Sequence, residues 1–226
     1  MQATETQSRA AADRVVAALL DRHGRSYCEE LGIRLETNTP SALFRWLCAA
    51  LLFSTRISAG LAHRAAKALT EQGWTTPRKM VQASWSERAQ VLNRAGYARY
   101  DERTATMLGS TAEMLLREYK GDLRLLRERA GREPQAERRL LREFKGIGDA
   151  GADIFCREAQ IVWDELYPFA DKKALATASE LGIASDVTEL AKLVPRRQFP
   201  RLLAALTRTG LAKDYDGVLE QAASGS

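Results

Sequence analysis

Two glycines separated by one isoleucine, Gly146-Ile147-Gly148, interrupt a sequence that is otherwise patterned for helices. Before them, residues 134–144 carry apolar side chains at helical spacing, and a second helical pattern runs from Asp149 to about Trp163. Glycine has no Cβ, so we expect both glycines to take positive φ angles and turn the chain sharply. The spacing therefore predicts a helix, a tight turn and a second helix, over about residues 138–156.

This hairpin has two interpretations. The amides of Gly148, Asp149 and Ala150 would lie open at a helix start, where a phosphate binds well, and DNA offers phosphates in series. On that interpretation the DNA contacts come from Lys145, Gly146, Ile147, Gly148 and Ala150. The alternative is a glycine-capped helix followed by another helix, which any all-helical protein can contain. Asp149 fits DNA binding poorly, because a carboxylate repels a phosphate.

Helical periodicity dominates the rest of the chain, and no convincing alternating pattern predicts a strand. The predicted fold class is therefore all-α. We expect helices over about residues 6–21, 40–53, 59–71, 100–119, 123–130, 134–144 and 149–163, two short helices that begin at Pro77 and Ser84, and three or four more after Pro168. Residues 222–226 are predicted to be a disordered tail.

Charge and cysteine content narrow the class of protein. The 226 residues include 34 Lys and Arg against 29 Asp and Glu, a net charge of +5, which is compatible with a polyanionic partner without requiring one. Residues 41–70 contain no acidic residue but are also strongly apolar, so burial explains part of that asymmetry. Three cysteines without a C-x-x-C spacing indicate neither a disulfide framework nor a zinc site, and favour a reducing compartment.

Neither a membrane segment nor a metal site is predicted. The longest apolar stretch, residues 47–53, is too short to cross a bilayer, and the N-terminal residues lack the apolar run of a signal peptide. We therefore expect a soluble cytoplasmic protein. His23 and His63 have no partner at ligand spacing, so no metal is expected.

The order of five features carries a family resemblance. A helix ends in LLFSTR at residues 51–56, a glycine turn follows at residues 95–97, then come a long helix, the FKGIGDAGA hairpin and the sequence PFAD at residues 168–171. This order resembles the helix-hairpin-helix DNA glycosylases, the endonuclease III-like group, from about Leu43 to Gly182. The resemblance implies a six-helix domain at residues 43–165, a second helical domain at residues 1–42 plus 166–226, and an active site in the cleft between them.

The resemblance also implies a catalytic carboxylate. Members of the family carry an aspartate at the head of a helix some twenty residues beyond the hairpin, and Asp171 lies 23 residues after Gly148. As an N-cap, Asp171 would accept amide hydrogen bonds and face the positive end of the helix dipole, both of which favour its ionised form. The same observations fit an ordinary helix cap without a chemical role.

Departures from the family pattern limit the chemistry. Members that cut the DNA strand carry a lysine two residues beyond the second hairpin glycine, where this chain has Ala150. A covalent imine requires an amine, so strand cutting by that route is not expected. Members with an iron–sulfur cluster have four clustered cysteines near the C-terminus, which this chain lacks, so no cofactor is expected. Ala49 stands where adenine-removing members have a glutamate.

Two further sets of residues follow from the family register. A flipped base leaves a gap in the duplex that side chains from two loops would fill; the candidates are Thr55, Arg56, Tyr97, Arg99 and Tyr100. Candidates to line the base pocket are Trp46, Trp163, Tyr167 and Phe169, for each of which packing in the core is the alternative.

The resemblance thus implies a monofunctional DNA glycosylase of base excision repair, acting as a monomer on duplex DNA with a damaged base. Two alternatives stay open at this point. The chain could bind DNA through the hairpin without catalysis, or it could be a helical interaction module in which the hairpin is only structural.

Overall fold

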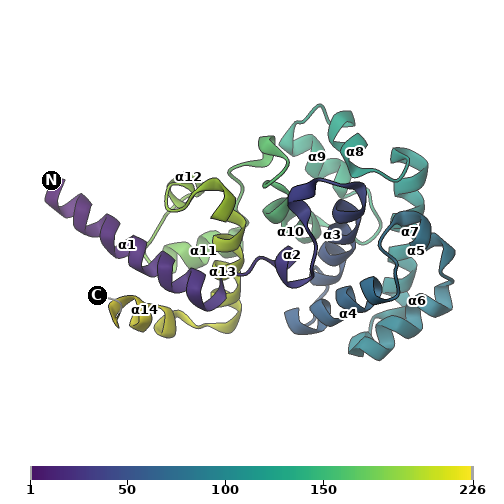
Figure 1. Cartoon of the computed structure of the whole chain (residues 1–226), viewed down its shortest axis with the longest axis horizontal. Coiled ribbons are helices and arrows are strands. Elements are labelled where there is room, and N and C mark those ends of the chain that lie inside the picture. The colour runs from purple at the N-terminus through teal and green to yellow at the C-terminus, as the bar shows by residue number, and fades with distance from the viewer. Residues whose placement is uncertain (1, 225–226) are drawn as a thin grey trace. The chain divides into compact units, whose positions relative to one another are not determined.

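The computed structural model describes residues 2–224, with side chains for residue 7 and residues 9–224, and contains no strand within that range. The predicted all-α class is confirmed. The chain divides into two compact units, which we call the internal unit (Leu31–Leu166) and the terminal unit (Met1–Glu30 with Tyr167–Ser226). Figure 1 shows the terminal unit assembled from both ends of the sequence, with purple α1 beside yellow α14.

The boundary of the internal unit differs from the one expected. Residues 31–42 were expected in the second domain, but residues from Leu31 onward pack with the internal unit. Arg45 holds them there, because its guanidinium donates to the carbonyl oxygens of Leu31 and Gly32 at 3.1 Å each.

The internal unit contains a short 3-10 turn followed by eight α-helices and two further helical turns. Their bounds are η1 Leu35–Thr37, α3 Pro40–Phe53, α4 Ala59–Glu71, α5 Pro77–Gln82, α6 Trp85–Leu92, the π-type turn η2 Asn93–Tyr97, α7 Asp101–Tyr119, α8 Leu123–Arg129, α9 Pro134–Leu141, α10 Asp149–Ala159 and η3 Asp164–Leu166. Helix α3 packs against α4 and α10, and α7 packs against α5 and α6. The buried length of α3 makes it the centre of this unit.

Local sequence signals explain several helix starts. Thr39 caps α3 by accepting a hydrogen bond from the amide of Ala42, and Pro40 follows at the first helical position. Ser84 and Glu87 form a capping box at the start of α6. These starts lie where the sequence predicted them, because a cap depends on residues within one turn.

The terminal unit contains α1 Gln2–His23, α2 Tyr27–Glu30, α11 Lys172–Glu180, α12 Val187–Ala191, η4 Arg196–Gln198, α13 Phe199–Ala212 and α14 Tyr215–Ser224. Helix α13 packs against α1 and α11, and α14 packs against α1. Its core joins Val15 and Leu19 of α1 to Leu202 and Leu206 of α13. Asp214 ties the ends together by accepting hydrogen bonds from Arg22 and contacting His23 at 2.9 Å.

Three expected boundaries were wrong, among them the end of α10, which lies at Ala159 rather than near Trp163. Helix α9 ends at Leu141 rather than at residue 144, because Phe144 leaves the helix to enter the core of the internal unit. The predicted disordered tail is helical as far as Ser224, because Val218 and Ala222 of α14 are buried in the terminal core. Residues 225 and 226 lie outside the described residues.

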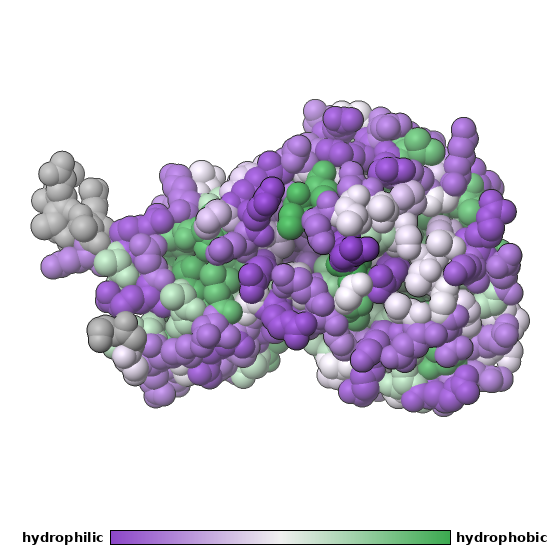
Figure 2. All heavy atoms as spheres, viewed as in Figure 1, coloured by the Kyte–Doolittle hydropathy of each residue, from purple (hydrophilic) through white to green (hydrophobic). Residues whose placement is uncertain are grey.

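The face of the molecule drawn in Figure 2 is largely polar. Hydrophilic residues cover most of both units on this face. Among the described residues, no helix combines the length and the apolar character that a membrane span requires.

Candidate nucleic-acid interface

The predicted hairpin is formed by α9, a seven-residue turn and α10. Phe144 and Ile147 anchor the turn, since both side chains are buried in the internal unit. Gly146 has φ +94°, and a Cβ at this position would lie 2.6 Å from the Met107 sulfur. Gly148 has φ −95° and open space around its missing Cβ, so the expectation of a positive φ holds for the first glycine alone.

The start of α10 has no side-chain cap. Gly148 is the N-cap residue, and the first backbone bond within the helix runs from the Ala152 amide to the Gly148 carbonyl at 2.9 Å. The amides of residues 149–151 therefore have no acceptor within α10. Gly148 and Ala150 are exposed, so an anion can approach this helix end from solvent.

A cavity of about 520 Å³ lies beside the hairpin, within the internal unit. Three segments line it: the loop after α3, the first turns of α7 and the hairpin turn. The lining residues are Ser54, Thr55, Arg56, Tyr100, Arg103, Thr104, Met107 and residues 142–148. The structure thus brings together Thr55, Arg56 and Tyr100 with the hairpin residues Lys145, Gly146, Ile147 and Gly148. We call this cavity the hairpin pocket.

The hairpin pocket is rich in cations. Its rim carries Arg56, Arg103, Arg142 and Lys145, all exposed, against the carboxylate of Glu143. Sequence reasoning missed Arg103 and Arg142, because they come from helix ends that only the tertiary fold brings beside the hairpin. The positive charge and the uncapped amides suit a polyanion such as the DNA backbone.

One hairpin carboxylate is neutralised internally. Arg142 Nη1 donates to Asp149 Oδ1 at 2.5 Å, so an ion pair links the end of α9 to the first residue of α10. The Asp149 side chain is 75% exposed and that of Arg142 is 46% exposed. The acidic residue that fits DNA binding poorly is therefore held by one of the cations of the hairpin pocket.

The wedge candidates lie in different environments. Tyr97 is buried, and its hydroxyl donates to the Leu52 carbonyl at 3.2 Å, so packing rather than contact with a base explains it. Tyr100 is half-buried in the hairpin pocket, and the Arg99 guanidinium lies 5.6 Å from the centre of its ring. Arg56 is exposed and Thr55 is half-buried. Of the two tyrosines, Tyr100 is the one placed to meet a ligand.

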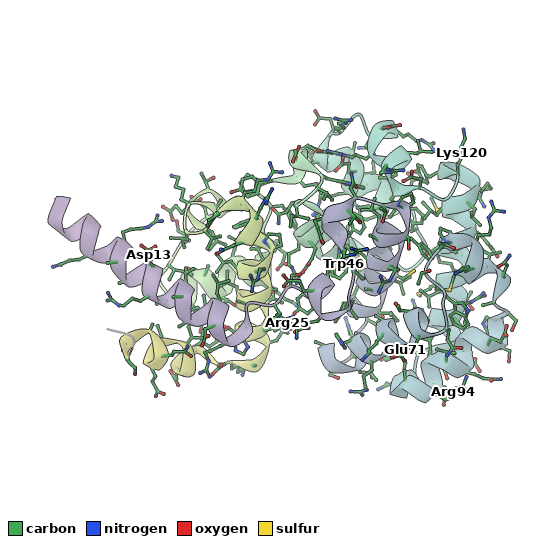
Figure 3. All side chains as sticks on the ribbon, viewed as in Figure 1. Asp13, Arg25, Trp46, Glu71, Arg94 and Lys120 are labelled. Carbon is green, nitrogen blue, oxygen red and sulfur yellow. The ribbon has the colours of Figure 1, made fainter. Side chains whose placement is uncertain are left out.

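Trp46 and Trp163 belong to the core of the internal unit, where both side chains are fully buried. Trp46, labelled in Figure 3, donates through its indole to the Phe155 carbonyl at 3.0 Å. Trp163 meets the Phe155 ring edge-on at 5.4 Å. Of the two roles that the sequence left open for these tryptophans, the structure supports core packing, because a residue without exposed surface cannot line an open base pocket.

Tyr167 and Phe169 are half-buried in the terminal unit, on the segment that leads to Asp171. The Tyr167 ring lies edge-on to Phe199 at 5.5 Å, and the Arg196 guanidinium lies 4.9 Å from its centre. Part of each aromatic residue therefore stays accessible, and the two precede Asp171 by four and two positions.

Asp171 is the N-cap residue of α11. Its Oδ1 accepts hydrogen bonds from the amides of Lys173 at 2.9 Å and Ala174 at 3.1 Å, and the residue is 6% exposed. The helix start thus fixes the orientation of the carboxylate and surrounds it with positive backbone dipole.

The cysteines of this chain do not fit an iron–sulfur cluster. Cys28, Cys48 and Cys156 are all buried free thiols, the first in the terminal unit and the others on α3 and α10. Burial raises the pKa of the Cys156 thiol to about 12. Three separated thiols cannot supply the four thiolates that such a cluster requires. Among the described residues, no group of three or more His, Cys, Asp or Glu is placed to hold a metal ion.

Known proteins are matched through their structures. No family model and no curated protein matches this sequence. A structure of a non-covalent endonuclease III–DNA complex superposes with a TM-score of 0.54 at 19% identity, over 86% of this chain and 81% of that one. A trapped endonuclease III–DNA covalent intermediate, in an estranged-adenine complex, gives a TM-score of 0.46 at 18% identity, over 72% and 71% of the two chains. The helices of this chain thus have the arrangement predicted from its motifs, an endonuclease III-like fold.

Proposed function

We propose that this chain is a DNA glycosylase, which flips a damaged base out of duplex DNA and removes it by hydrolysis. The observation that carries this proposal is the endonuclease III-like fold together with a carboxylate, Asp171, held at the head of α11. The matched structures are complexes of endonuclease III with DNA, and the hairpin pocket of this chain offers cations and open amides for the same class of ligand.

Asp171 would act on the sugar. As the bond between base and sugar breaks, the electron pair leaves with the base and positive charge develops at C1′. A fixed carboxylate stabilises that charge and orients the water that adds to C1′, while the departing base takes up a proton. The two amide hydrogen bonds hold the carboxylate in the fixed orientation that this role requires.

The internal unit would hold the DNA. The hairpin would bind backbone phosphates without reading sequence, and Arg56 and Tyr100 would occupy the gap left by the flipped nucleotide. Strand cutting through a lysine imine is not part of the proposal, because Ala150 offers no amine.

Single-turnover base release tests the proposal. Duplexes that each carry one alkylated, deaminated or oxidised base would be incubated with the wild type, Asp171→Asn and Asp186→Asn. Hot alkali would then cleave the strand at any abasic site. Asp186 is a matched control, since it caps α12 of the same unit through the amides of Thr188 and Glu189. Asparagine caps helices about as well as aspartate, so both variants keep the fold.

We expect D171N to slow base release by about 100-fold or more, and D186N to change it by less than about 2-fold. The strand should remain intact until alkali is added. Salt-dependent binding without release from any duplex would favour a DNA-binding protein without catalysis, in which Asp171 is only a helix cap. Equal losses in D171N and D186N would also remove Asp171 from the chemistry.

A further inference from the structure

Two ion pairs join the helices of the hairpin, one turn apart. Arg138 of α9 pairs with Asp153, and Arg142, the residue that follows α9, pairs with Asp149, so two of the arginines here face aspartates of α10. The Arg138–Asp153 pair is partly buried, at 27% and 26% exposure. The Arg142–Asp149 pair is more exposed, at 46% and 75%, and Arg142 also lines the hairpin pocket.

This second pair lies where a bound phosphate would compete with it. Asp149 is the first residue of α10, next to amides that have no acceptor in the helix, and its carboxylate already contacts Arg142. A phosphate at the pocket and the Asp149 carboxylate are both anions, so they compete for one guanidinium and repel each other.

We propose that Asp149 is an internal competitor for the DNA phosphate, and that Arg142 exchanges the Asp149 carboxylate for a backbone phosphate when the hairpin binds DNA. The inference rests on the proposed DNA-binding function. It assigns to Asp149 a role in setting how tightly the hairpin holds any DNA backbone, damaged or not.

The exposure of the pair makes this exchange feasible. An ion pair in contact with solvent contributes little to stability, so a phosphate contact can replace it. Because the released carboxylate stays near the phosphate, it weakens sequence-independent binding. The wild-type hairpin therefore grips undamaged DNA less strongly than its four rim cations alone would allow.

The test is a double-mutant cycle on the full chain, with binding to an undamaged duplex measured over a series of salt concentrations. We expect Asp149→Asn to tighten binding about 3- to 10-fold at low salt, and to steepen the slope of log K against log salt by up to about 0.9, the value for one more neutralised phosphate. Arg142→Gln should weaken wild-type binding less than about 3-fold, because Asp149 already occupies this arginine. In the D149N background, the same R142Q change should remove all of the affinity that D149N gains.

Glu118→Gln is the control, since it removes one negative charge from another exposed arginine pair of the same unit, on α7 and outside the hairpin pocket. The inference is overturned if D149N binds no more tightly than E118Q, or if R142Q has the same effect in both backgrounds. Base release measured beside binding separates this failure from that of the proposed function. If base release depends on Asp171 while D149N and E118Q bind equally, the role of Asp149 is rejected and the proposed function is retained.

Discussion

Single residues of the hairpin show which parts of the site local sequence can predict. The turn was predictable because Gly146 must adopt φ +94°, a backbone conformation that favours glycine. Which candidate side chains are exposed was not predictable from local sequence. Tyr97 follows a helix-ending glycine as a surface wedge would, yet it is buried, because its turn packs against α4 and α6 and its hydroxyl donates to the Leu52 carbonyl of α3.

The two hairpin glycines should differ in their tolerance of a side chain. Gly146→Ala combines a strained φ with a Cβ 2.6 Å from the Met107 sulfur, so we expect it to lower the free energy of unfolding by about 1–3 kcal/mol. Gly148→Ser has a negative φ, open space and a hydroxyl suited to cap α10, so it should be neutral or slightly stabilising. Urea unfolding of both variants checks this. Equal losses would contradict the geometry described here.

At the scale of elements, helix starts and the order of helices followed from the sequence, because caps and periodicity act within one or two turns. The hairpin pocket could not be predicted from the sequence. Arg103 at the start of α7 and Arg142 at the end of α9 carry no motif, and they become neighbours of Arg56 through packing of distant segments. The same limit applied to residues 31–42, whose place in the internal unit depends on hydrogen bonds from Arg45.

A pair of neighbouring glutamates, Glu137 and Glu165, also joins α9 to η3. Glu137 is fully buried in α9, and burial, with the neighbouring Glu165 second, raises the pKa of its carboxyl to about 9. Glu165 is only partly buried, which by itself would raise its pKa, but hydrogen bonds from Arg127 at 2.5 Å lower its pKa to about 2. Glu137 is therefore protonated and Glu165 ionised at neutral pH.

These shifts predict opposite effects of pH on stability. Between pH 4.5 and 9, folded Glu137 holds a proton that the unfolded chain releases, so its contribution to stability falls as pH rises. Glu165 contributes stability above pH 4.5 that is lost as pH falls toward 2. Glu137→Gln should remove the first effect, so its gain over the wild type should increase from pH 5 to pH 9. Urea unfolding at pH 5, 7 and 9 measures this, and parallel curves for the two proteins would contradict it.

At the scale of the whole molecule, the fold class and the endonuclease III-like arrangement were predictable from motif order alone. The proposed chemistry, however, draws on both units, with the hairpin in the internal unit and Asp171 in the terminal unit. A single sequence contains no record of contacts between distant segments. The expectation of an active site in a cleft between the two domains therefore stays a prediction.

Adding an amine to the hairpin tests that prediction. In Ala150→Lys, the new amine would attack C1′ of the abasic sugar, water would leave, and borohydride would reduce the resulting imine to a stable protein–DNA bond. Ala150 is exposed in the first turn of α10, so the side chain should be tolerated. We expect trapped complex with A150K and none with the wild type, whose Lys145 serves as the control within the same hairpin. Base release without trapping would place residue 150 away from the sugar.

The discontinuity of the terminal unit has a consequence for synthesis on the ribosome. Residues 31–166 can collapse once they have emerged, but α1 must wait for α13 and α14, which are made more than 170 residues later. Until then, Val15 and Leu19 have no Leu202 or Leu206 to pack against. The unit that we propose to hold the DNA can thus exist on a nascent chain before the unit that carries Asp171. During synthesis, the ability to bind DNA would then arise before the ability to release a base.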